Sequence, residues 1–199
     1  MIIVGLTGGI GSGKTTVANF FKQLDIPIYI ADVEAKNLMV TSKIIKRRLI
    51  ELFGDNVYEN NKLNKSLISE KIFNDSSFLN KINAIVHPKV ASHFKRWCKK
   101  QNSPYVIKEA AIIFEHKQES KYDYIITVTA DKQERINRVI KRDNSSKSKI
   151  EAIINNQVSD EEKIKKSHFV IINNDIESTQ DQVINTHKSL LKLIAKTKI

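Results

Sequence analysis

The sequence predicts an α/β fold of three layers, in which helices cover both faces of a parallel five-stranded sheet and a helical insertion and a lid are added. Three observations predict it. Short apolar segments rich in β-branched residues recur along the chain, amphipathic helical patterns separate them, and a glycine-rich turn follows the first segment. Strands that alternate with helices form parallel sheets. The expected strands are residues 2–6, 28–30, 105–107, 124–129 and 168–172.

The first strand leads into residues 8–15, which read GGIGSGKT and match the phosphate-loop pattern G-x-x-x-x-G-K-[ST]. Val17, Phe21 and Leu24 repeat at helical spacing after it, so the loop stands between a strand and a helix. A glycine-rich turn before an ordinary helix is the alternative, which the complete set of strand, loop, Lys-Thr pair and helix disfavours. The sequence therefore predicts the P-loop NTPase fold and a bound nucleoside triphosphate.

Each part of this loop has an expected task. Glycines let the backbone turn and aim consecutive N–H groups inward, and the following helix adds the positive end of its dipole. Lys14 is expected to reach the β- and γ-phosphates, Thr15 to ligate Mg²⁺, and Thr16 to hydrogen-bond the α-phosphate. The expected nucleotide contacts along the loop are Gly11, Ser12, Gly13, Lys14, Thr15 and Thr16.

The composition limits the kinds of molecule that the protein is expected to bind. With 199 residues, 41% of them hydrophobic, the chain can form one domain with a sizeable core. Its formal net charge of +11 indicates anionic partners, but scattered basic residues without interleaved aromatics disfavour nucleic acid. Cys98 is the only cysteine, which suits a reducing cytosol. No run reaches membrane-spanning length and the N-terminus lacks a basic leader, so we expect a cytoplasmic protein without a membrane or obligate protein partner.

The whole chain is expected to form a single domain, because no internal repeat or second boundary is visible. Helical patterns fill residues 41–101 almost throughout, with turns at 54–56 and 60–61, and indicate an insertion between two strands. The expected parts of domain 1–199 are a core of residues 1–40, 103–142 and 167–199, a helical substrate-binding insertion of residues 41–102, and a lid of residues 143–166.

Asp32 stands at the carboxyl end of the second strand, on the edge where open α/β sheets bind their ligands. A carboxylate there could accept a proton from a hydroxyl group that attacks the γ-phosphate. A helix N-cap for residues 33–39 is an equally good account, so position alone leaves both open.

Other candidate side chains lie in the insertion and after the third strand. His87 precedes Pro88, where a helix is expected to begin with His87 just outside it. A lone histidine is more often structural than functional. Glu109 or Glu115 could orient magnesium-bound water or a substrate group, and surface caps explain them equally well.

After the fourth strand, Asp131 and Glu134 have the spacing of a capping box at the start of a helix. Arg135, Arg138 and Arg142 then lie along one face of that helix. Such a row can clamp a migrating phosphoryl group, although most surface arginines are only solvated. Its place after a strand of a phosphate-loop fold favours the clamp.

A polar segment, residues 143–149, is expected to form a mobile loop, followed by a lysine-rich helical stretch over 150–166 that contains Gln157. Together they could close over the phosphates as a lid. The last strand ends at Asn173, and an amphipathic helix completes the chain.

Taken together, these features resemble the dephospho-coenzyme A kinase family over nearly the whole chain. The matching segments are GLTGGIGSGKT at 5–15, Ala31-Asp32, His87-Pro88, IIFE at 112–115, the run 138–143, Gln157 before EEK at 161–163, and VIINN at 170–174. The resemblance implies transfer of the γ-phosphate of ATP to the ribose 3′-hydroxyl of dephospho-coenzyme A, the last step of coenzyme A synthesis. ATP and Mg²⁺ are the implied cofactors.

The resemblance also assigns roles to single residues. Asp32 matches the family's general base, which favours that reading over the N-cap, and His87 matches a histidine of its substrate-binding region. Arg142 matches a lid arginine near ATP, and Asn173 lies where the last strand borders the adenine. The expected set is catalytic Asp32, Lys14 and Arg142, nucleotide-binding Arg138 and Asn173 beside the loop, and substrate-binding Asp32, Lys36, His87, Glu115 and Gln157.

The sequence departs from the family pattern at positions that bear on the affinity for substrate and not on the class of reaction. Ile30 stands where the family commonly has a first Asp, and Lys36 stands where Arg or His is common. Two rival functions follow from the residues alone: a kinase for another small acceptor such as a nucleoside monophosphate, and a non-catalytic nucleotide switch or nucleic-acid-binding module. A guanine-nucleotide switch is disfavoured because Asn61-Lys62-Leu63-Asn64 lacks the final Asp of the base-reading motif.

Overall fold

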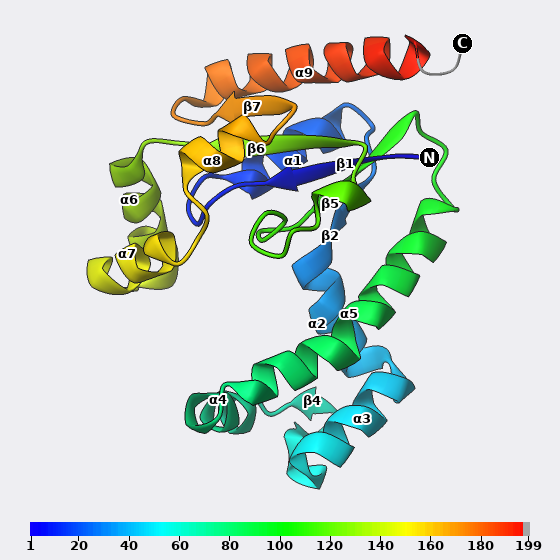
Figure 1. Ribbon diagram of the computed structural model, residues 1–199, viewed down its shortest axis with the longest axis vertical. Helices are drawn as coiled ribbons and strands as arrows, with labels where there is room; N and C mark the ends of the chain where they lie inside the picture. The colour runs from blue at the N-terminus through cyan, green and yellow to red at the C-terminus, as the bar shows by residue number, and fades with distance from the viewer. Residues whose placement is uncertain (197–199) are drawn as a thin grey trace. The chain divides into compact units, whose positions relative to one another are not determined.

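The computed structural model describes residues 1–196, which form two compact units (Figure 1). The first unit comprises residues 1–29 together with the chain from Gln101 onward, and the second comprises residues 30–100. Each unit is described by itself below.

A five-stranded sheet forms the centre of the first unit, in the order β2-β5-β1-β6-β7. Its strands are β1 (Ile2–Thr7), β2 (Ile28–Ile30), β5 (Tyr105–Glu109), β6 (Tyr124–Thr129) and β7 (Phe169–Ile172). β1 pairs in parallel with both β5 and β6, and β6 pairs in parallel with β7. The predicted parallel five-stranded sheet is confirmed. Because β1 is the central strand, the loop after it opens at the middle of the sheet's carboxyl edge.

Side chains of β1 alternate between two apolar layers. Val4 and Leu6 belong to the main core together with α1 (Lys14–Gln23) and α9 (Ile176–Lys196), which lie on one face of the sheet. Ile3 packs on the other face, in a cluster that includes Ile113 and Tyr122. This period of two is what a strand buried on both faces requires, and it confirms the three-layer arrangement.

Helices α6 (Lys132–Asp143), α7 (Lys147–Asn155) and α8 (Asp160–Lys165) follow β6, and a short 3₁₀ helix (Glu119–Lys121) precedes it. The mobile loop expected over 143–149 is wrong in extent, because α6 runs through Asp143 and α7 begins at Lys147. Asn144 ends α6 in the left-handed conformation (φ 50°), and Ile150 is fully buried against Ile136 and Val139. Residues 156–159, between α7 and α8, are called the lid connector below.

Four helices make up most of the second unit: α2 (Ala31–Thr41), α3 (Lys43–Phe53), α4 (Lys65–Asn74) and α5 (Ser77–Cys98), with a 3₁₀ helix at Asp55–Val57. Sequence analysis missed a small hairpin, β3 (Tyr58–Glu59) and β4 (Lys62–Leu63). Asn60 and Asn61 both have positive φ, 48° and 62°, as a two-residue type I′ turn requires. Strands of two residues are too short to leave a periodic pattern.

The expected helix start at Pro88 is also wrong. α5 is continuous from Ser77 to Cys98, with Pro88 inside it and His87 in its middle. Proline removes one backbone hydrogen bond, but the apolar stripe continues on both sides, with Val86 and Val90 both buried. Packing of this stripe outweighs the local penalty.

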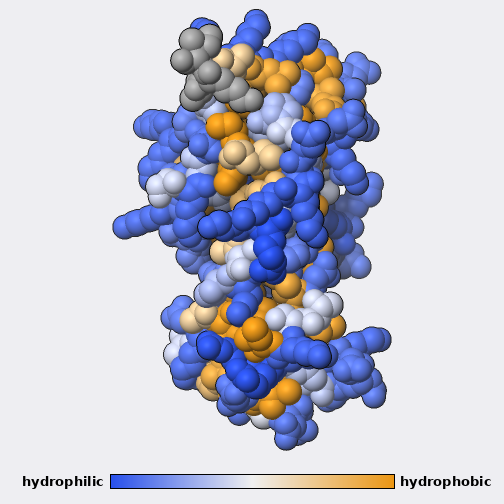
Figure 2. All heavy atoms as spheres, turned by 90° about the vertical axis from the view of Figure 1, so that its right-hand side faces the viewer, coloured by the Kyte–Doolittle hydropathy of each residue, from blue (hydrophilic) through white to orange (hydrophobic). Residues whose placement is uncertain are grey.

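The molecular surface seen in Figure 2 is mostly hydrophilic, and the apolar residues on this face occur in small groups separated by polar ones. Within residues 1–196, no helix combines the length and the apolar character that a membrane span needs.

Candidate active site

Two glycines give the phosphate loop its shape. Gly11 has φ 77° and Gly13 has φ 89°, values that side-chain-bearing residues adopt only at a cost. Gly13 is the N-cap of α1, so the loop ends where the backbone N–H groups of the first helical turn point outward. A Cβ atom at Gly13 would also collide with the amide nitrogen of Asn173. The loop therefore has the turn and the helix terminus that a phosphate site requires.

Lys14 lies across this loop. Its Nζ atom donates to the carbonyl oxygens of Gly8 at 2.9 Å and Gly9 at 3.4 Å, so the ammonium group is held at the loop rather than in bulk solvent. Thr15 is exposed in the first turn of α1, and its hydroxyl is open to a ligand there. The expected positions of a phosphate-contacting lysine and a metal-ligating hydroxyl are both compatible with this geometry.

Asn173 closes one side of the loop from the end of β7. Its side chain is 5% exposed, and its Nδ2 atom donates to the carbonyl oxygen of Ser12 at 2.9 Å. Arg138 Nη2 donates to the carbonyl oxygen of Asn173 at 2.9 Å. Arg138 Nη1 is buried without a hydrogen-bond partner in the described residues, and it lies 3.8 Å from the position that a Gly13 Cβ would take. A charged donor thus faces the loop.

The three arginines of α6 do not form one clamp. Arg135 is 4% exposed and donates from Nε to the carbonyl oxygen of Ile10 in the loop. Arg142 is exposed and forms two hydrogen bonds of 2.7 Å with its neighbour Asp143. These bonds lower the pKa of the Asp143 carboxyl group and raise that of the Arg142 guanidinium group. Within this row, Arg138 presents a buried donor beside the loop that has no hydrogen-bond partner in the described residues.

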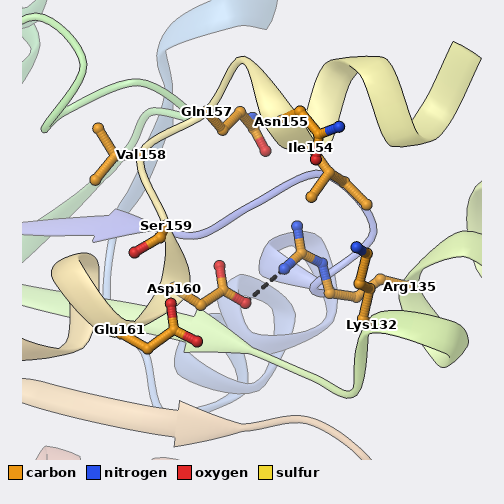
Figure 3. A pocket seen from close by; sticks show the side chains of 9 residues that line it. All are labelled: Lys132, Arg135, Ile154, Asn155, Gln157, Val158, Ser159, Asp160 and Glu161. Atoms are coloured by element: carbon orange, nitrogen blue, oxygen red, sulfur yellow. Dashed lines mark hydrogen bonds and ion pairs between the residues drawn. The ribbon is translucent and has the colours of Figure 1, made fainter.

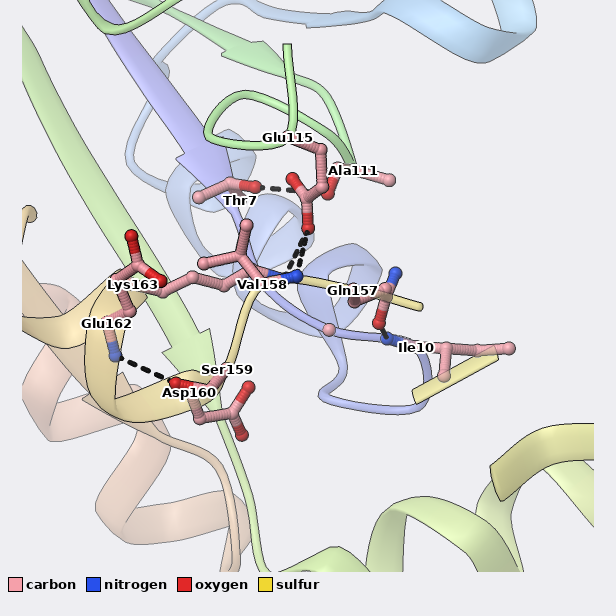
Figure 4. A network of polar contacts seen from close by, with 12 residues as sticks. Thr7, Ile10, Ala111, Glu115, Gln157, Val158, Ser159, Asp160, Glu162 and Lys163 are labelled. Atoms are coloured by element: carbon pink, nitrogen blue, oxygen red, sulfur yellow. Dashed lines mark hydrogen bonds and ion pairs between the residues drawn. The ribbon is translucent and has the colours of Figure 1, made fainter. Parts of the chain in front are cut away.

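Glu115 and Gln157 both contact the lid connector or the loop. Glu115 Oε1 forms a 2.9 Å ion pair with the fully buried Lys163 and accepts from the Val158 N–H at 3.2 Å (Figure 4). Gln157 Oε1 accepts from the Ile10 N–H at 3.0 Å. Neither contact was expected, because each joins segments that are distant in the sequence.

A cavity of about 390 Å³ lies beside these contacts. Its walls come from Lys132 and Arg135 of α6, from residues 154–155 and from residues 157–161, which include Gln157 and Asp160 (Figure 3). Figure 3 shows Arg135 and Asp160 joined across it by an ion pair. The cavity therefore borders the side of the lid that contacts the phosphate loop.

Comparison with known proteins decides the family. A family model described as dephospho-CoA kinase matches residues 2–179. A dephospho-CoA kinase of Bacteroides fragilis is 38% identical over 173 residues, which cover 86% of this chain and 84% of that protein. The chain belongs to the dephospho-CoA kinase family. This family of kinases catalyses the final step of coenzyme A biosynthesis.

Solved structures agree with this family in fold. The crystal structure of TT1252 from Thermus thermophilus has a TM-score of 0.86 at 27% identity, covering 96% of this chain and 97% of that one. Dephospho-CoA kinase from Campylobacter jejuni has a TM-score of 0.69 at 20% identity, with coverage of 96% and 97%. The second likeness concerns the fold alone.

Three residues that the dephospho-CoA kinase resemblance singled out lie in the second unit. Asp32 is exposed in the first turn of α2, and the N-cap of that helix is Ile30, so the N-cap alternative for Asp32 is wrong. Lys36 is exposed one turn further along α2, and His87 is exposed in the middle of α5. Their contacts with substrate stay predictions.

The capping box expected at the start of α6 does not form. Asp131 is the N-cap residue, but its side chain makes no capping hydrogen bond. Its backbone N–H instead donates to the side chain of Asn174 at 2.9 Å. Asn174, which lies after β7, thus takes the place of Glu134, the partner that the sequence spacing indicated.

Lys163 and Asp160 are the residues of this dephospho-CoA kinase site whose importance sequence reasoning missed. Both stand in a polar, charged stretch, and no local pattern distinguishes a buried lysine from the exposed ones around it. The family segment EEK at 161–163 was the one available signal, because it includes Lys163.

We expect Lys163→Met to lower the free energy of unfolding by about 3 kcal/mol, because it leaves the half-buried Glu115 carboxylate without its cation. Denaturant titration measures this change. Lys166→Met is the matched control, since Lys166 forms an exposed pair with Glu162 and its loss should change stability far less. Equal effects of the two substitutions would contradict the assignment of a buried pair. Adding Glu115→Leu to Lys163→Met should restore part of the loss.

Proposed function

We propose that this protein transfers the γ-phosphate of ATP to the ribose 3′-hydroxyl of dephospho-coenzyme A and releases coenzyme A and ADP. The observation that carries the proposal is the phosphate loop, with Gly11 and Gly13 in the left-handed region and the Lys14 ammonium group held across it. Membership of the dephospho-CoA kinase family supports the choice of acceptor. We expect the reaction to take place in the cytoplasm, without a nucleic acid or an obligate protein partner.

The nucleotide would bind through the backbone N–H groups of the loop and the Lys14 ammonium group. Gly11 and Gly13 would supply N–H groups, and Thr16 would supply a hydroxyl for the α-phosphate. Ser12 stays an expected contact, because its N–H group donates to the Gly9 carbonyl oxygen at 3.2 Å in the present arrangement. Arg138 Nη1 supports this role, because a buried guanidinium donor without a partner is costly unless an anion completes it. Asn173, anchored on the carbonyl of Ser12, would border the adenine.

The donor set also fits a Mg²⁺ ion. Thr15 offers an exposed hydroxyl oxygen at the start of α1, and Mg²⁺ prefers oxygen ligands from a few side chains, water and substrate phosphates. The ion, when bound, would neutralise negative charge on the phosphates. Residues 1–196 contain no group of three or more His, Cys, Asp or Glu side chains able to hold a metal, which agrees with a site completed by the nucleotide.

On the acceptor side, Asp32 would receive the proton of the attacking hydroxyl group. Lys36 and His87 would bind dephospho-coenzyme A, Lys36 as a point charge toward a phosphate. Glu115 would reach substrate through Oε2, since Oε1 is occupied by Lys163, and Gln157 would use Nε2, since Oε1 is bound to Ile10. The proton of the hydroxyl group therefore ends on the Asp32 carboxylate, and the other side chains align the substrate.

Arg142 would neutralise negative charge on the migrating phosphoryl group when the lid closes. In the present arrangement its guanidinium group is paired with Asp143, and both side chains are exposed. An exposed pair of this kind is weak, so a phosphate can compete for the arginine. The barrier is lowered mainly by alignment and charge neutralisation.

The direct test is to incubate the purified protein with ATP, Mg²⁺ and dephospho-coenzyme A and to measure coenzyme A and ADP. Equal amounts of the two products are expected. A panel of other acceptors, including nucleoside monophosphates, provides the comparison. Faster transfer to any of them, or ADP release without coenzyme A, would overturn the proposed acceptor.

A further inference from the structure

The backbone of Ile10 in the phosphate loop is held on both sides by side chains from outside the loop. Its N–H group donates to Gln157 Oε1 at 3.0 Å, and its carbonyl oxygen accepts from Arg135 Nε at 2.9 Å. Figure 4 shows Gln157 reaching Ile10 from the lid connector. The two peptides that flank Ile10, Gly9–Ile10 and Ile10–Gly11, are therefore each held by one side chain, from the lid connector and from α6 respectively.

Arg135 also fills the space beside two loop glycines. Its guanidinium group lies where a Cβ atom of Gly9 would be, and its own backbone carbonyl lies where a Cβ atom of Gly11 would be. Only 4% of Arg135 is exposed. Residues 9–11 thus all contact Arg135. Gly9 and Gly11 are required for this contact as well as for the turn, because a side chain at either position would collide with Arg135.

Asp160 holds Arg135 in this orientation. Arg135 Nη1 forms an ion pair with Asp160 Oδ2, and the same oxygen accepts from the Thr129 hydroxyl group at 2.8 Å. Figure 3 shows the pair. The negative charge of Asp160 offsets the positive charge of the Arg135 guanidinium group. Arg135 therefore orients the loop backbone and adds little net positive charge to it.

The lid connector is itself anchored. Glu115 accepts from the Val158 N–H at 3.2 Å, one residue after Gln157, and the buried Lys163 holds the Glu115 carboxylate. Gln157 and Asp160 flank this anchored residue within four positions of the chain. The connector can therefore hold the Gln157 side chain and the Asp160 carboxylate in fixed positions relative to the loop.

We propose that Gln157 and Arg135 are positioning residues for phosphoryl transfer, which fix the planes of the two peptides that flank Ile10 and thereby the direction of the Gly11 N–H group and of the loop N–H groups that follow it. This inference rests on the proposed binding of ATP by the loop. A rotation of the Ile10–Gly11 peptide would turn the Gly11 N–H group, which lies in the same plane, away from the phosphates. Nucleotide affinity should therefore fall.

Gln157→Met is the central test, because methionine has a similar length and cannot accept the Ile10 N–H bond. We expect KM for ATP to rise about tenfold, the effect of one unsatisfied backbone donor. The dissociation constant of ADP, measured by calorimetry, should rise by the same factor. Gln157→Glu retains an acceptor oxygen and loses the amide donor, so it should keep most of the ADP affinity.

Arg135→Lys supplies the second arm, because a lysine can serve Ile10 or Asp160 but not both. Since both side chains act on the adjacent peptides that flank Ile10, Gln157→Met combined with Arg135→Lys should weaken ADP binding by less than the product of the single effects. Gln133→Met on the exposed face of α6 is the matched control and should leave both KM values unchanged. Melting temperatures identify any variant that is simply unfolded.

Two outcomes would overturn the inference. If Gln157→Met raises KM for dephospho-coenzyme A and leaves ADP binding intact, Gln157 acts on the acceptor. If the single effects multiply fully, Arg135 and Gln157 do not act jointly on the backbone at Ile10. Absence of ADP binding by the unaltered protein would instead contradict the proposed function.

Discussion

Lys14→Met is expected to lower kcat/KM for ATP by about 10³-fold, because the ammonium group neutralises charge that develops on the migrating phosphoryl group. Lys14 begins α1, and its Nζ atom lies 2.9 Å from the carbonyl oxygen of Gly8. A phosphate in the loop would meet that charge without rearrangement of the backbone. Steady-state kinetics with varied ATP measures the loss.

Lys22→Met is the matched control, since Lys22 is an exposed lysine in the last turn of the same helix. It removes the same formal charge from α1 at a distance from the loop, and activity should stay near that of the unaltered protein. If both variants lost activity equally, the effect would come from net charge or from helix stability. Activity of Lys14→Met within tenfold of normal would contradict the role of the loop lysine.

Asp32→Asn is expected to lower kcat by about 10²-fold, at the lower end of general-base effects, because a loose phosphoryl transition state requires little early proton transfer. The substitution preserves the size of the side chain and leaves residues 8–15 untouched. The dissociation constant of ADP should therefore be unchanged. Single-turnover kinetics separates the chemical step from product release.

Asp25→Asn serves as the control for that substitution. Asp25 is an exposed carboxylate with φ 58°, a conformation that asparagine tolerates well, and it lies in the turn before β2. Its replacement should affect neither kcat nor ADP binding. Near-normal turnover of Asp32→Asn would show that another group accepts the proton.

The phosphate loop could be predicted from the sequence because its structure is local. The eight residues 8–15 carry their own turn glycines, their lysine and their hydroxyl group, and the apolar strand before them and the helix after them follow directly. The parallel sheet was predictable for a similar reason, since β-branched segments buried on both faces have a distinctive composition. His87 was placed wrongly relative to its helix, because the local effect of Pro88 is weaker than the packing of α5.

The three arginines of α6 mark the limit of such reasoning. Spacing along a helix does not distinguish Arg135, Arg138 and Arg142, because it specifies only the helix face on which they lie. Their partners differ: a loop carbonyl 125 residues away for Arg135, the end of β7 for Arg138, and the adjacent carboxylate for Arg142. Burial and partner are set by which segments the fold brings beside α6.

The fold class, the phosphate loop and the family could be read from the amino-acid sequence, because each depends on residues that are neighbours in the chain or on patterns along one element. Only folding in three dimensions brings Arg135 and Gln157 to the two peptides that flank Ile10 and buries Lys163 against Glu115. Such contacts join segments far apart in the chain. The free energy of a polar group depends on the partners and the burial that packing provides, and neither is encoded in local spacing.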